Sequence, residues 1–240
     1  MGDSFDFKEG EVLLFDKPYG PTSFSIVNRA RGIIKRKLNV KKIKVGHAGT
    51  LDPLATGLLV ICTGKATKTI MGIQDAEKEY TGTITLGATT PSYDLETEVN
   101  ETFPINHITN ELIHQTAKDF EGELDQMPPI FSAKQVDGKR AYDLARAGKE
   151  VKLNTKRITI KEFEITSISR SEDKVEVNFR VACSKGTYIR SLAFDLGKTL
   201  NSGGYLSTLR RTRIGNHHVD DAITTDQFQF LLHGDGLENS

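Results

Sequence analysis

Tryptophan is missing from this 240-residue sequence, cysteine occurs only twice, and no apolar run is long enough to cross a bilayer. Cys62 and Cys183 lie far apart and form no Cys-x-x-Cys pair, which argues against a disulfide framework and a structural zinc site. The first residues, MGDSFDFKEGEVLL, contain no basic segment followed by an apolar run, so they do not resemble a secretory signal. Low-complexity tracts of Gly/Ser, Pro or Gln are absent as well. Together these absences predict a globular cytoplasmic protein without a membrane anchor.

Net charge is also absent, but the charges are distributed in blocks. The chain has 32 Lys and Arg residues and 32 Asp and Glu residues. Residues 29–44 contain eight Lys and Arg and no acid, whereas residues 214–240 contain five acids and no Lys or Arg. Such separation can create one positive face for phosphates and an acidic remainder. The basic segment is equally compatible with an ordinary solvated helix face, so charge alone leaves both interpretations open.

Hydrophobic periodicity predicts strands and helices that do not alternate regularly. A strand in EVLLFDKPYGPTS ends at a Pro/Gly turn, and Thr22 or Ser23 caps a helix with apolar residues at helical spacing. GLLVICTG is apolar throughout, as expected of a strand buried on both faces. Further strands are predicted in KEYTGTITLG and, as a hairpin, at 156–169 and 173–183; further helices are predicted at 107–120, at 139–147 and, with Thr187 as cap, in YIRSLAFDLGKTL. This order favours an α+β fold with a mixed, largely antiparallel sheet flanked by helices over a doubly wound fold.

Residues 126–152 differ in composition from the segments around them. They hold many cations and few acids, and the adjacent Pro128 and Pro129 break any strand there. An excursion from the core is therefore predicted. A plain surface loop and a segment that contacts RNA are both compatible with this composition.

The stretch GHAGTLDPLATG, residues 46–57, places a single carboxylate, Asp52, among glycines and small apolar residues. One interpretation is structural, with Asp52 capping a helix whose first position is Pro53. The three glycines favour a second interpretation, because glycine lets the backbone approach a ligand closely and a cap does not require that.

Other kinds of site fit this stretch poorly. GLLVICTGKAT has six residues between its glycines where a phosphate-binding P-loop has four, and its Lys is followed by Ala. His47, Cys62 and the His217–His218 pair share no metal-ligand spacing. No second carboxylate stands near Asp52, as a glycosidase would need. What remains is one carboxylate acting without a metal, a nucleotide cofactor or a local partner acid.

Five blocks, taken in order, resemble the TruB family of tRNA pseudouridine synthases. They are DKPYGPTSF, GHAGTLDPLATGLLVICTGKATK, KEYTGTITLGATTPSYD, QMPPIFSAKQVDGKRAYDLAR and CSKGTYIRSLAFDLG followed by LRRTRIG, and they cover most of residues 11–215. The resemblance implies a pseudouridine synthase domain over 1–215, with 126–152 as an RNA-clamping insertion and 216–240 as a short acidic tail without further strands. Many family members continue into an added RNA-binding domain, which we expect to be absent here.

The resemblance also implies the reaction. Family enzymes detach uracil from its ribose, rotate it and rejoin it through C5, which needs a nucleophile but no cofactor and no metal. Asp52 corresponds to this nucleophile, attacking either the uracil ring or the anomeric carbon, and the sequence does not choose between these routes. Because a uridine inside a folded loop is unreachable, it has to be flipped out onto an aromatic or apolar surface.

Five more residues correspond to site positions of the family. Tyr80 matches a tyrosine that packs on the flipped base and handles protons, although without the resemblance it would be interpreted as a core aromatic. Arg190 matches an arginine that pairs with the nucleophile and keeps it ionised, the alternatives being a phosphate contact or a solvated helix residue. Tyr188 and Leu209 match positions that line the base pocket, which core packing also explains. His47 matches a histidine that contacts the RNA near the flipped base.

The expected function is therefore isomerisation of uridine 55 in the T loop of tRNA by a monomer that binds the T arm, with no membrane and no small-molecule cofactor involved. Lys17 and Pro18 match a motif that supports the site, and we assign them no chemistry. The rival from another class is a non-catalytic RNA-binding or RNA-folding protein on the same scaffold. Asp52, Tyr80 and Arg190 together argue against it, since binding alone would not need that trio. A third interpretation, an RNA-directed hydrolase or NTPase, lacks its metal or phosphate-loop signature.

Overall fold

The computed structural model describes residues 5–130, 135–136, 139–140 and 154–234. These residues divide into two compact units, the first formed by residues 1–78 and 210–240 and the second by residues 79–209. Strand β12 (Gly204–Ile214) runs through both units. None of the described helices is long and apolar enough to span a membrane.

The first unit contains a small mixed sheet with the strand order β1-β3-β12. β1 (Val12–Lys17) and β2 (Val45–His47) both pair antiparallel with β3 (Thr56–Thr63), and β12 pairs parallel with it from Arg210 to Arg211. Every residue of β3 from Gly57 onward is buried. The continuous apolar run in the sequence therefore predicted this central strand correctly.

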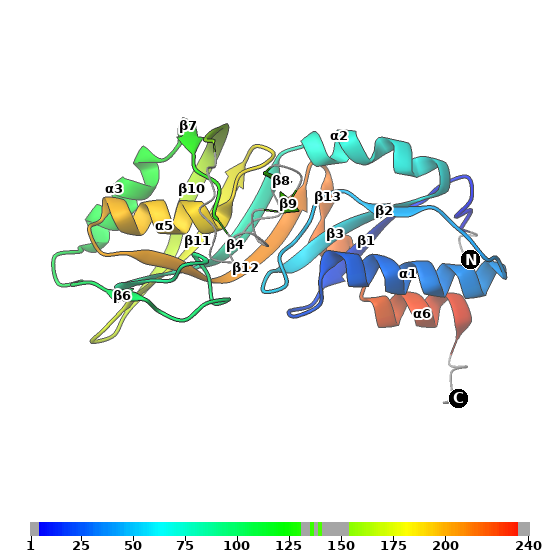
Figure 1. Cartoon of the computed structure of the whole chain (residues 1–240), viewed down its shortest axis with the longest axis horizontal. Coiled ribbons are helices and arrows are strands. Elements are labelled where there is room, and N and C mark those ends of the chain that lie inside the picture. The colour runs from blue at the N-terminus through cyan, green and yellow to red at the C-terminus, as the bar shows by residue number, and fades with distance from the viewer. Residues whose placement is uncertain (1–4, 131–134, 137–138, 141–153, 235–240) are drawn as a thin grey trace. The chain divides into compact units, whose positions relative to one another are not determined.

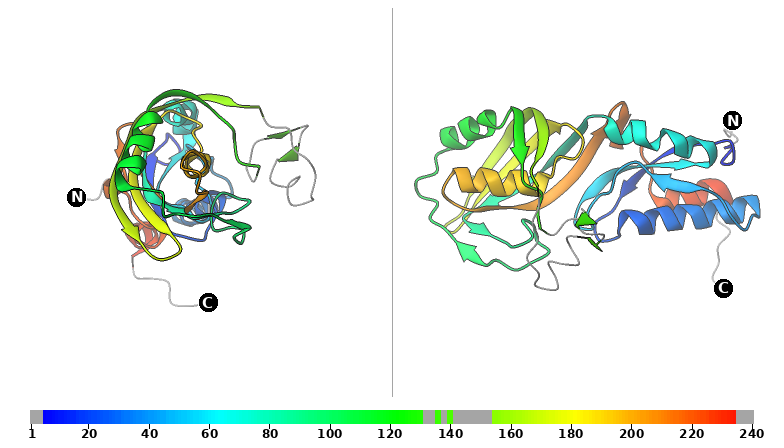
Figure 2. Two further views of the ribbon diagram at one scale, coloured as in Figure 1. Left: turned by 90° about the vertical axis from the view of Figure 1, so that its left-hand side faces the viewer. Right: turned by 45° about the horizontal axis from the view of Figure 1, so that its top comes forward.

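Two helices lie side by side in the first unit (Figures 1 and 2). α1 (Ser23–Leu38) begins where the Thr22 side chain accepts a hydrogen bond from the Ser25 N–H, so the predicted cap is confirmed. Its apolar stripe packs with α6 (Thr225–His233), whose Phe228 is completely buried in the same core cluster. The remaining elements of the unit are η1 (Gly64–Thr69), α2 (Ile70–Asp75), β13 (His217–His218) and η2 (Val219–Asp221).

The carboxyl-terminal segment differs from the short tail without strands that we expected at 216–240. In its described part, β13 pairs antiparallel with the end of β12, and the side chain of Thr224 caps α6 in a reciprocal capping box with Gln227. The acidic composition hid this structure, because only a few apolar residues of the described segment, such as Phe228 and Leu232, reach the core.

The second unit is built on the strand order β12-β4-β11-β10-β7, in which β10 pairs antiparallel with both β11 and β7. β10 (Lys156–Arg170) and β11 (Val175–Cys183) form the predicted hairpin, and β7 (Gly122–Gln126) pairs with the other edge of β10. The strand order also includes β4 (Lys78–Leu86), and β5 (Ala88–Thr89) forms a separate antiparallel pair with β6 (Glu101–Thr102). In the core the rings of Phe163 and Phe179 meet edge to face, with centroids 5.8 Å apart.

In the described part of this unit, two helices, α3 (Asn110–Asp119) and α5 (Ile189–Thr199), accompany the sheet (Figure 1). α3 contacts β10 and also α5. The predicted cap of α5 is wrong. Tyr188 occupies the N-cap position without a side-chain bond, and the Thr187 hydroxyl donates instead to the Ser184 carbonyl oxygen at 2.9 Å.

The predicted insertion at 126–152 falls mostly outside the described residues. Within it, β8 (Gln135–Val136) pairs antiparallel with β9 (Lys139–Arg140). The helix predicted at 139–147 is therefore wrong at its first two residues, which form a strand, and its remaining residues lie outside the described ranges. The RNA-clamping role of this insertion stays a prediction.

Candidate active site

Asp52 lies in a tight turn of the first unit. The Ala55 N–H donates to the Asp52 carbonyl oxygen at 3.1 Å, and β3 begins directly afterwards at Thr56. No helix begins at Asp52 or Pro53, so the structural interpretation of this pair as a helix start is wrong. Asp52 is half-buried rather than fully solvated. The turn therefore holds a carboxylate at the surface end of a buried strand.

Gly57 is required by the backbone that closes this turn. Its φ is +101°, and a Cβ atom there would lie 2.3 Å from the carbonyl oxygen of Arg211 on the neighbouring strand. A side chain would push β3 and β12 apart just behind the turn. This glycine serves strand packing rather than approach of a ligand.

Hydrogen bonds fix the backbone on both sides of Asp52. Ser23 Oγ donates to the Leu51 carbonyl oxygen at 2.9 Å and accepts from the Leu51 N–H at 2.8 Å. The Pro53 carbonyl oxygen accepts from the Gly20 N–H at 2.9 Å and from Lys17 Nζ at 3.2 Å. Each neighbour of Asp52 is thus held by the segment that joins β1 to α1.

Arg211 holds the earlier part of the same turn. Its side chain is 2% exposed, and its guanidinium donates to the carbonyl oxygens of Leu58 at 2.8 Å and Gly49 at 3.0 Å, with Thr50 at the 3.5 Å limit. A buried guanidinium with several acceptors in fixed directions orders the loop that it reaches. Arg211 belongs to the LRRTRIG block, and its local pattern does not indicate this role.

The electrostatics of this turn are dominated by buried cations. Lys17 is completely buried, and burial lowers its pKa from 10.5 to about 8, while the charge of Asp52 raises it and the charge of Arg211 lowers it. The Lys17 ammonium also donates to the Pro18 carbonyl oxygen at 2.8 Å. We assigned Lys17 no chemistry from the sequence. The structure makes it an anchor of the turn and an electrostatic neighbour of Asp52.

His47 lies on β2, opposite Ile61 of β3. Burial lowers its pKa, and the charge of Arg211 acts in the same direction, so the imidazole is neutral at pH 7. Its Nδ1 atom is buried without a hydrogen-bond partner among the residues that the structure describes. An unsatisfied polar atom of this kind is uncommon in a finished core and is more typical of a binding site.

The second unit holds the other four predicted residues. Tyr80 is 9% exposed on β4, and Leu209 is half-buried on β12. Tyr188 stands at the start of α5, where the buried amide of Gln126 holds its backbone in both directions. Gln126 Nε2 donates to the Tyr188 carbonyl oxygen at 3.0 Å, and the Tyr188 N–H donates to Gln126 Oε1 at 2.8 Å. Ser191 Oγ adds a bond to the Met127 carbonyl oxygen at 2.7 Å.

Arg190 is buried in the first turn of α5, beside an acidic residue that sequence reasoning missed. Its Nε atom lies 3.6 Å from Asp94 Oδ2, and both side chains are 7% exposed. The guanidinium also donates to the Ser92 carbonyl oxygen at 3.2 Å, and Asp94 Oδ1 accepts from the Glu96 N–H at 3.0 Å. Arg190 is therefore neither a solvated helix residue nor an exposed phosphate contact. Its pairing with Asp52 stays a prediction.

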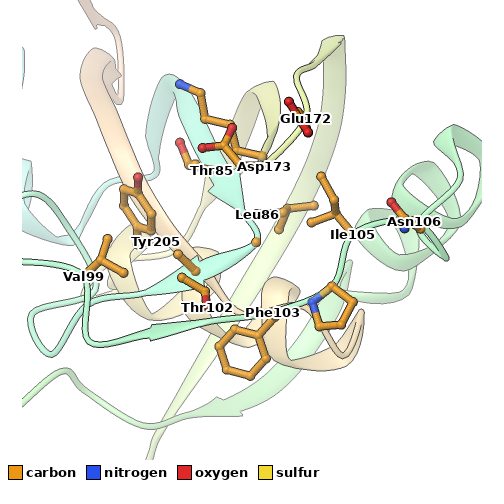
Figure 3. A pocket seen from close by; sticks show the side chains of 14 residues that line it. Thr85, Leu86, Val99, Thr102, Phe103, Ile105, Asn106, Glu172, Asp173 and Tyr205 are labelled. Atoms are coloured by element: carbon orange, nitrogen blue, oxygen red, sulfur yellow. The ribbon is translucent and has the colours of Figure 1, made fainter.

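In the part of the chain that the structure describes, no metal centre competes with these residues. Within the described ranges, no group of three His, Cys, Asp or Glu residues is placed to hold a metal ion. A cavity of about 510 Å³ opens in the second unit, between the end of β4, the β5–β6 pair and the turn between β10 and β11 (Figure 3). Thr85, Ile105, Asp173 and Tyr205 are among its lining residues, and none of the predicted site residues is.

Comparison with known proteins gives consistent results. Residues 35–189 match the family described as TruB family pseudouridylate synthase, N-terminal domain. A protein named tRNA pseudouridine synthase B from Flavobacterium johnsoniae is 56% identical over 228 residues, covering 95% of this chain and 98% of that protein. One of the same name from Bacteroides thetaiotaomicron is 51% identical over 234 residues, covering 98% of each.

A solved structure resembles the chain as well. A chain in the structure of an H/ACA RNP bound to a substrate RNA containing 2′-deoxyuridine superposes with a TM-score of 0.66 and 30% identity, covering 97% of this chain. The match spans 57% of that longer chain. The α+β fold with a mixed, mostly antiparallel sheet that the sequence indicated is confirmed by this likeness and by the strand pairing.

Proposed function

Because the chain belongs to the TruB family of pseudouridylate synthases, we propose that it isomerises uridine to pseudouridine in tRNA. The names of its bacterial relatives, which it matches over nearly their whole length, support tRNA as the substrate. The reaction breaks the bond between uracil N1 and ribose C1′ and forms one between C5 and C1′. It changes neither the oxidation state nor the number of water molecules, so it asks the protein for a nucleophile and a dry site.

The observation that carries the proposal is the fixed turn around Asp52. Hydrogen bonds from Ser23, Gly20 and Lys17 hold Leu51 and Pro53, so the carboxylate between them is positioned before substrate arrives. A nucleophile that is already oriented avoids the entropic cost of finding its geometry during the reaction. Asp52 is our nucleophile, with attack on the uracil ring and attack on the anomeric carbon both open.

The remaining predicted residues receive roles in holding the flipped nucleotide. Tyr80 stacks on the flipped uracil and handles its proton, and Tyr188 and Leu209 line the base pocket. Arg190 keeps the Asp52 carboxylate ionised and is itself oriented by the buried carboxylate of Asp94. His47, neutral at pH 7, contacts the RNA beside the flipped base.

The finer specificity also belongs to the proposal. The substrate position is uridine 55 in the T loop, reached through the T arm by a monomer of this chain in the cytoplasm. The basic run at 29–44 supplies cations for the adjoining phosphates. The rival, a non-catalytic RNA-binding protein on the same fold, would have no use for the oriented carboxylate.

The deciding experiment measures tritium release from C5-labelled uridine in an unmodified tRNA transcript and in an isolated T-arm hairpin. The wild-type chain is expected to turn over both, with kcat/KM values within about tenfold. Asp52→Asn is expected to lose turnover while keeping tRNA affinity within about tenfold, roughly 1.4 kcal/mol. Turnover by the asparagine variant would refute the nucleophile, and RNA binding without turnover by the wild type would favour the rival. A hairpin that is a hundredfold worse, with a shallower salt dependence of binding, would refute recognition through the T arm alone.

A further inference from the structure

Two large aromatic side chains are exposed near the start of α1, one before the helix and one in its first turn. Tyr19 is 61% exposed and Phe24 is 63% exposed. Phe24 is on α1 but outside the buried stripe of that helix, which is formed by Ser23, Ile26, Val27, Ala30, Ile33 and Ile34. Neither side chain therefore contributes substantially to the core. An exposed apolar pair beside a functional turn is more typical of a contact surface than of folding requirements.

These two residues stand next to the anchors that hold Asp52. Tyr19 directly precedes Gly20, whose N–H donates to the Pro53 carbonyl oxygen. Phe24 directly follows Ser23, whose hydroxyl is bonded to the backbone of Leu51 in both directions. Each anchor of the Asp52 turn, Gly20 and Ser23, therefore has an exposed aromatic residue as its neighbour in the chain. The Cα atoms of such neighbours lie about 3.8 Å apart.

Other segments of the described chain do not cover the backbone at Gly20, the residue that follows Tyr19. Gly20 has a φ of +103°, and a Cβ atom built on it would meet no atom of a more distant residue within 4 Å. A ligand is therefore able to approach the backbone at this anchor of Pro53.

The charge of α1 indicates what kind of ligand this surface takes. The helix contains Arg29, Arg31, Lys35, Arg36 and Lys37 and no Asp or Glu, and of these Arg29 forms an ion pair with Asp226 of α6. Aromatic rings followed by a run of cations match the two parts of a nucleic-acid strand, namely the faces of its bases and its phosphates. A protein partner of acidic and apolar character is the alternative occupant.

We propose that Tyr19 and Phe24 form a stacking platform for the unpaired RNA bases that flank the target uridine. The proposal rests on the function proposed above. Removing the target uridine from its loop leaves its neighbours without a stacking partner, and rings beside Asp52 restore that contact on the protein. Stacking on a ring does not select a base, so the platform holds the strand in register while the pocket around Tyr80 chooses the uridine.

The test uses a T-arm hairpin with 2-aminopurine in place of the nucleotide on either side of the target uridine, because stacking quenches the fluorescence of this base. The whole chain is compared with Tyr19→Ala, Phe24→Ala and their combination. Tyr19→Phe and Phe24→Tyr keep the rings. Phe230→Ala is the matched control, since Phe230 is an aromatic residue of similar exposure, 59%, that lies on another helix, α6.

The alanine variants are expected to weaken hairpin binding about tenfold each and to lose quenching at one flanking position, with an unchanged melting temperature. The ring-keeping variants and Phe230→Ala should bind and quench like the wild type. Unchanged quenching and affinity in the combined alanine variant would overturn the platform, and would leave a protein partner as the occupant of this surface. Tritium release by the wild type is measured in parallel. If the wild type quenches the flanking bases but forms no pseudouridine, the proposed function fails and the platform stands.

Discussion

Lys17 and Pro53 are joined by a hydrogen bond of 3.2 Å from a completely buried ammonium to a carbonyl oxygen directly after Asp52. The two residues lie far apart in the sequence, and their hydrogen bond connects β1 to the turn before β3. A buried cation is costly to desolvate, and it persists here because the backbone carbonyls and the Asp52 carboxylate compensate for the lost water.

Replacing Lys17 by Met should change the pH dependence of stability. The pKa of Lys17 is about 8 in the folded chain against an ordinary 10.5, so between these values the unfolded state binds more protons than the folded state. Unfolding free energy of the wild type should therefore rise with pH across this window, by up to about 3 kcal/mol, relative to Lys17→Met. Urea melts of both chains at pH 7, 8, 9 and 10 measure the difference. A constant difference over this range would contradict the lowered pKa.

Ser23→Ala should impair catalysis by loosening the turn. The substitution removes both hydrogen bonds to the Leu51 backbone, and buried amide groups without partners cost about 1–3 kcal/mol each. We expect a loss of about 2 kcal/mol in unfolding free energy and a fall in kcat larger than any change in KM. Ser25→Ala is the control, because the Ser25 hydroxyl bonds only to the exposed Thr22 carbonyl oxygen. Equal kinetics for the two variants would show that the Leu51 contact does not position Asp52.

Asp94→Asn should destabilise the second unit strongly. It removes the charge of the buried carboxylate that lies 3.6 Å from the 7%-exposed guanidinium of Arg190, and breaking such a pair costs about 3–5 kcal/mol. The matched control is Asp125→Asn, which breaks the 3.4 Å pair with Arg157 between side chains that are 59% and 58% exposed. That change should cost less than about 1 kcal/mol. Chemical denaturation of the two variants decides, and similar losses would mean that the Arg190 pair contributes no more than a surface contact.

Tyr80 variants should separate stacking from proton handling. Tyr80→Phe keeps the ring, so hairpin affinity is expected to stay near that of the wild type while tritium release falls. Tyr80→Leu should lose affinity as well, since stacking of a base on a ring contributes about 1–3 kcal/mol. Because Tyr80 is only 9% exposed, its replacement also changes core packing, so the melting temperatures of both variants are measured. If both variants turn over like the wild type, Tyr80 is a core residue only.

Local patterns in the sequence determined much of the fold. The amphipathic spacing and the Thr22 cap were sufficient to predict α1, the apolar run predicted β3, and the strict alternation in 173–183 predicted the hairpin of β10 and β11. The sequence shows these features because the spacing of apolar residues depends on whether a helix or strand is buried on one face or on two. The ordered blocks also indicated the family and placed Asp52 in its motif.

Only the tertiary structure decided which polar groups hold the site. Gln126 is hydrogen-bonded to the backbone of Tyr188, 62 residues further along the chain. Arg190 lies beside Asp94, from which 96 residues of sequence separate it. Periodicity shows that a position is buried but not which distant group satisfies its hydrogen bonds. The same reason explains the segment after 216, where Phe228 enters the core beside α1 although the surrounding composition is acidic. Long-range polar partners and sparse apolar contacts depend on where the chain returns in space, and that is fixed only by the complete packing of the fold.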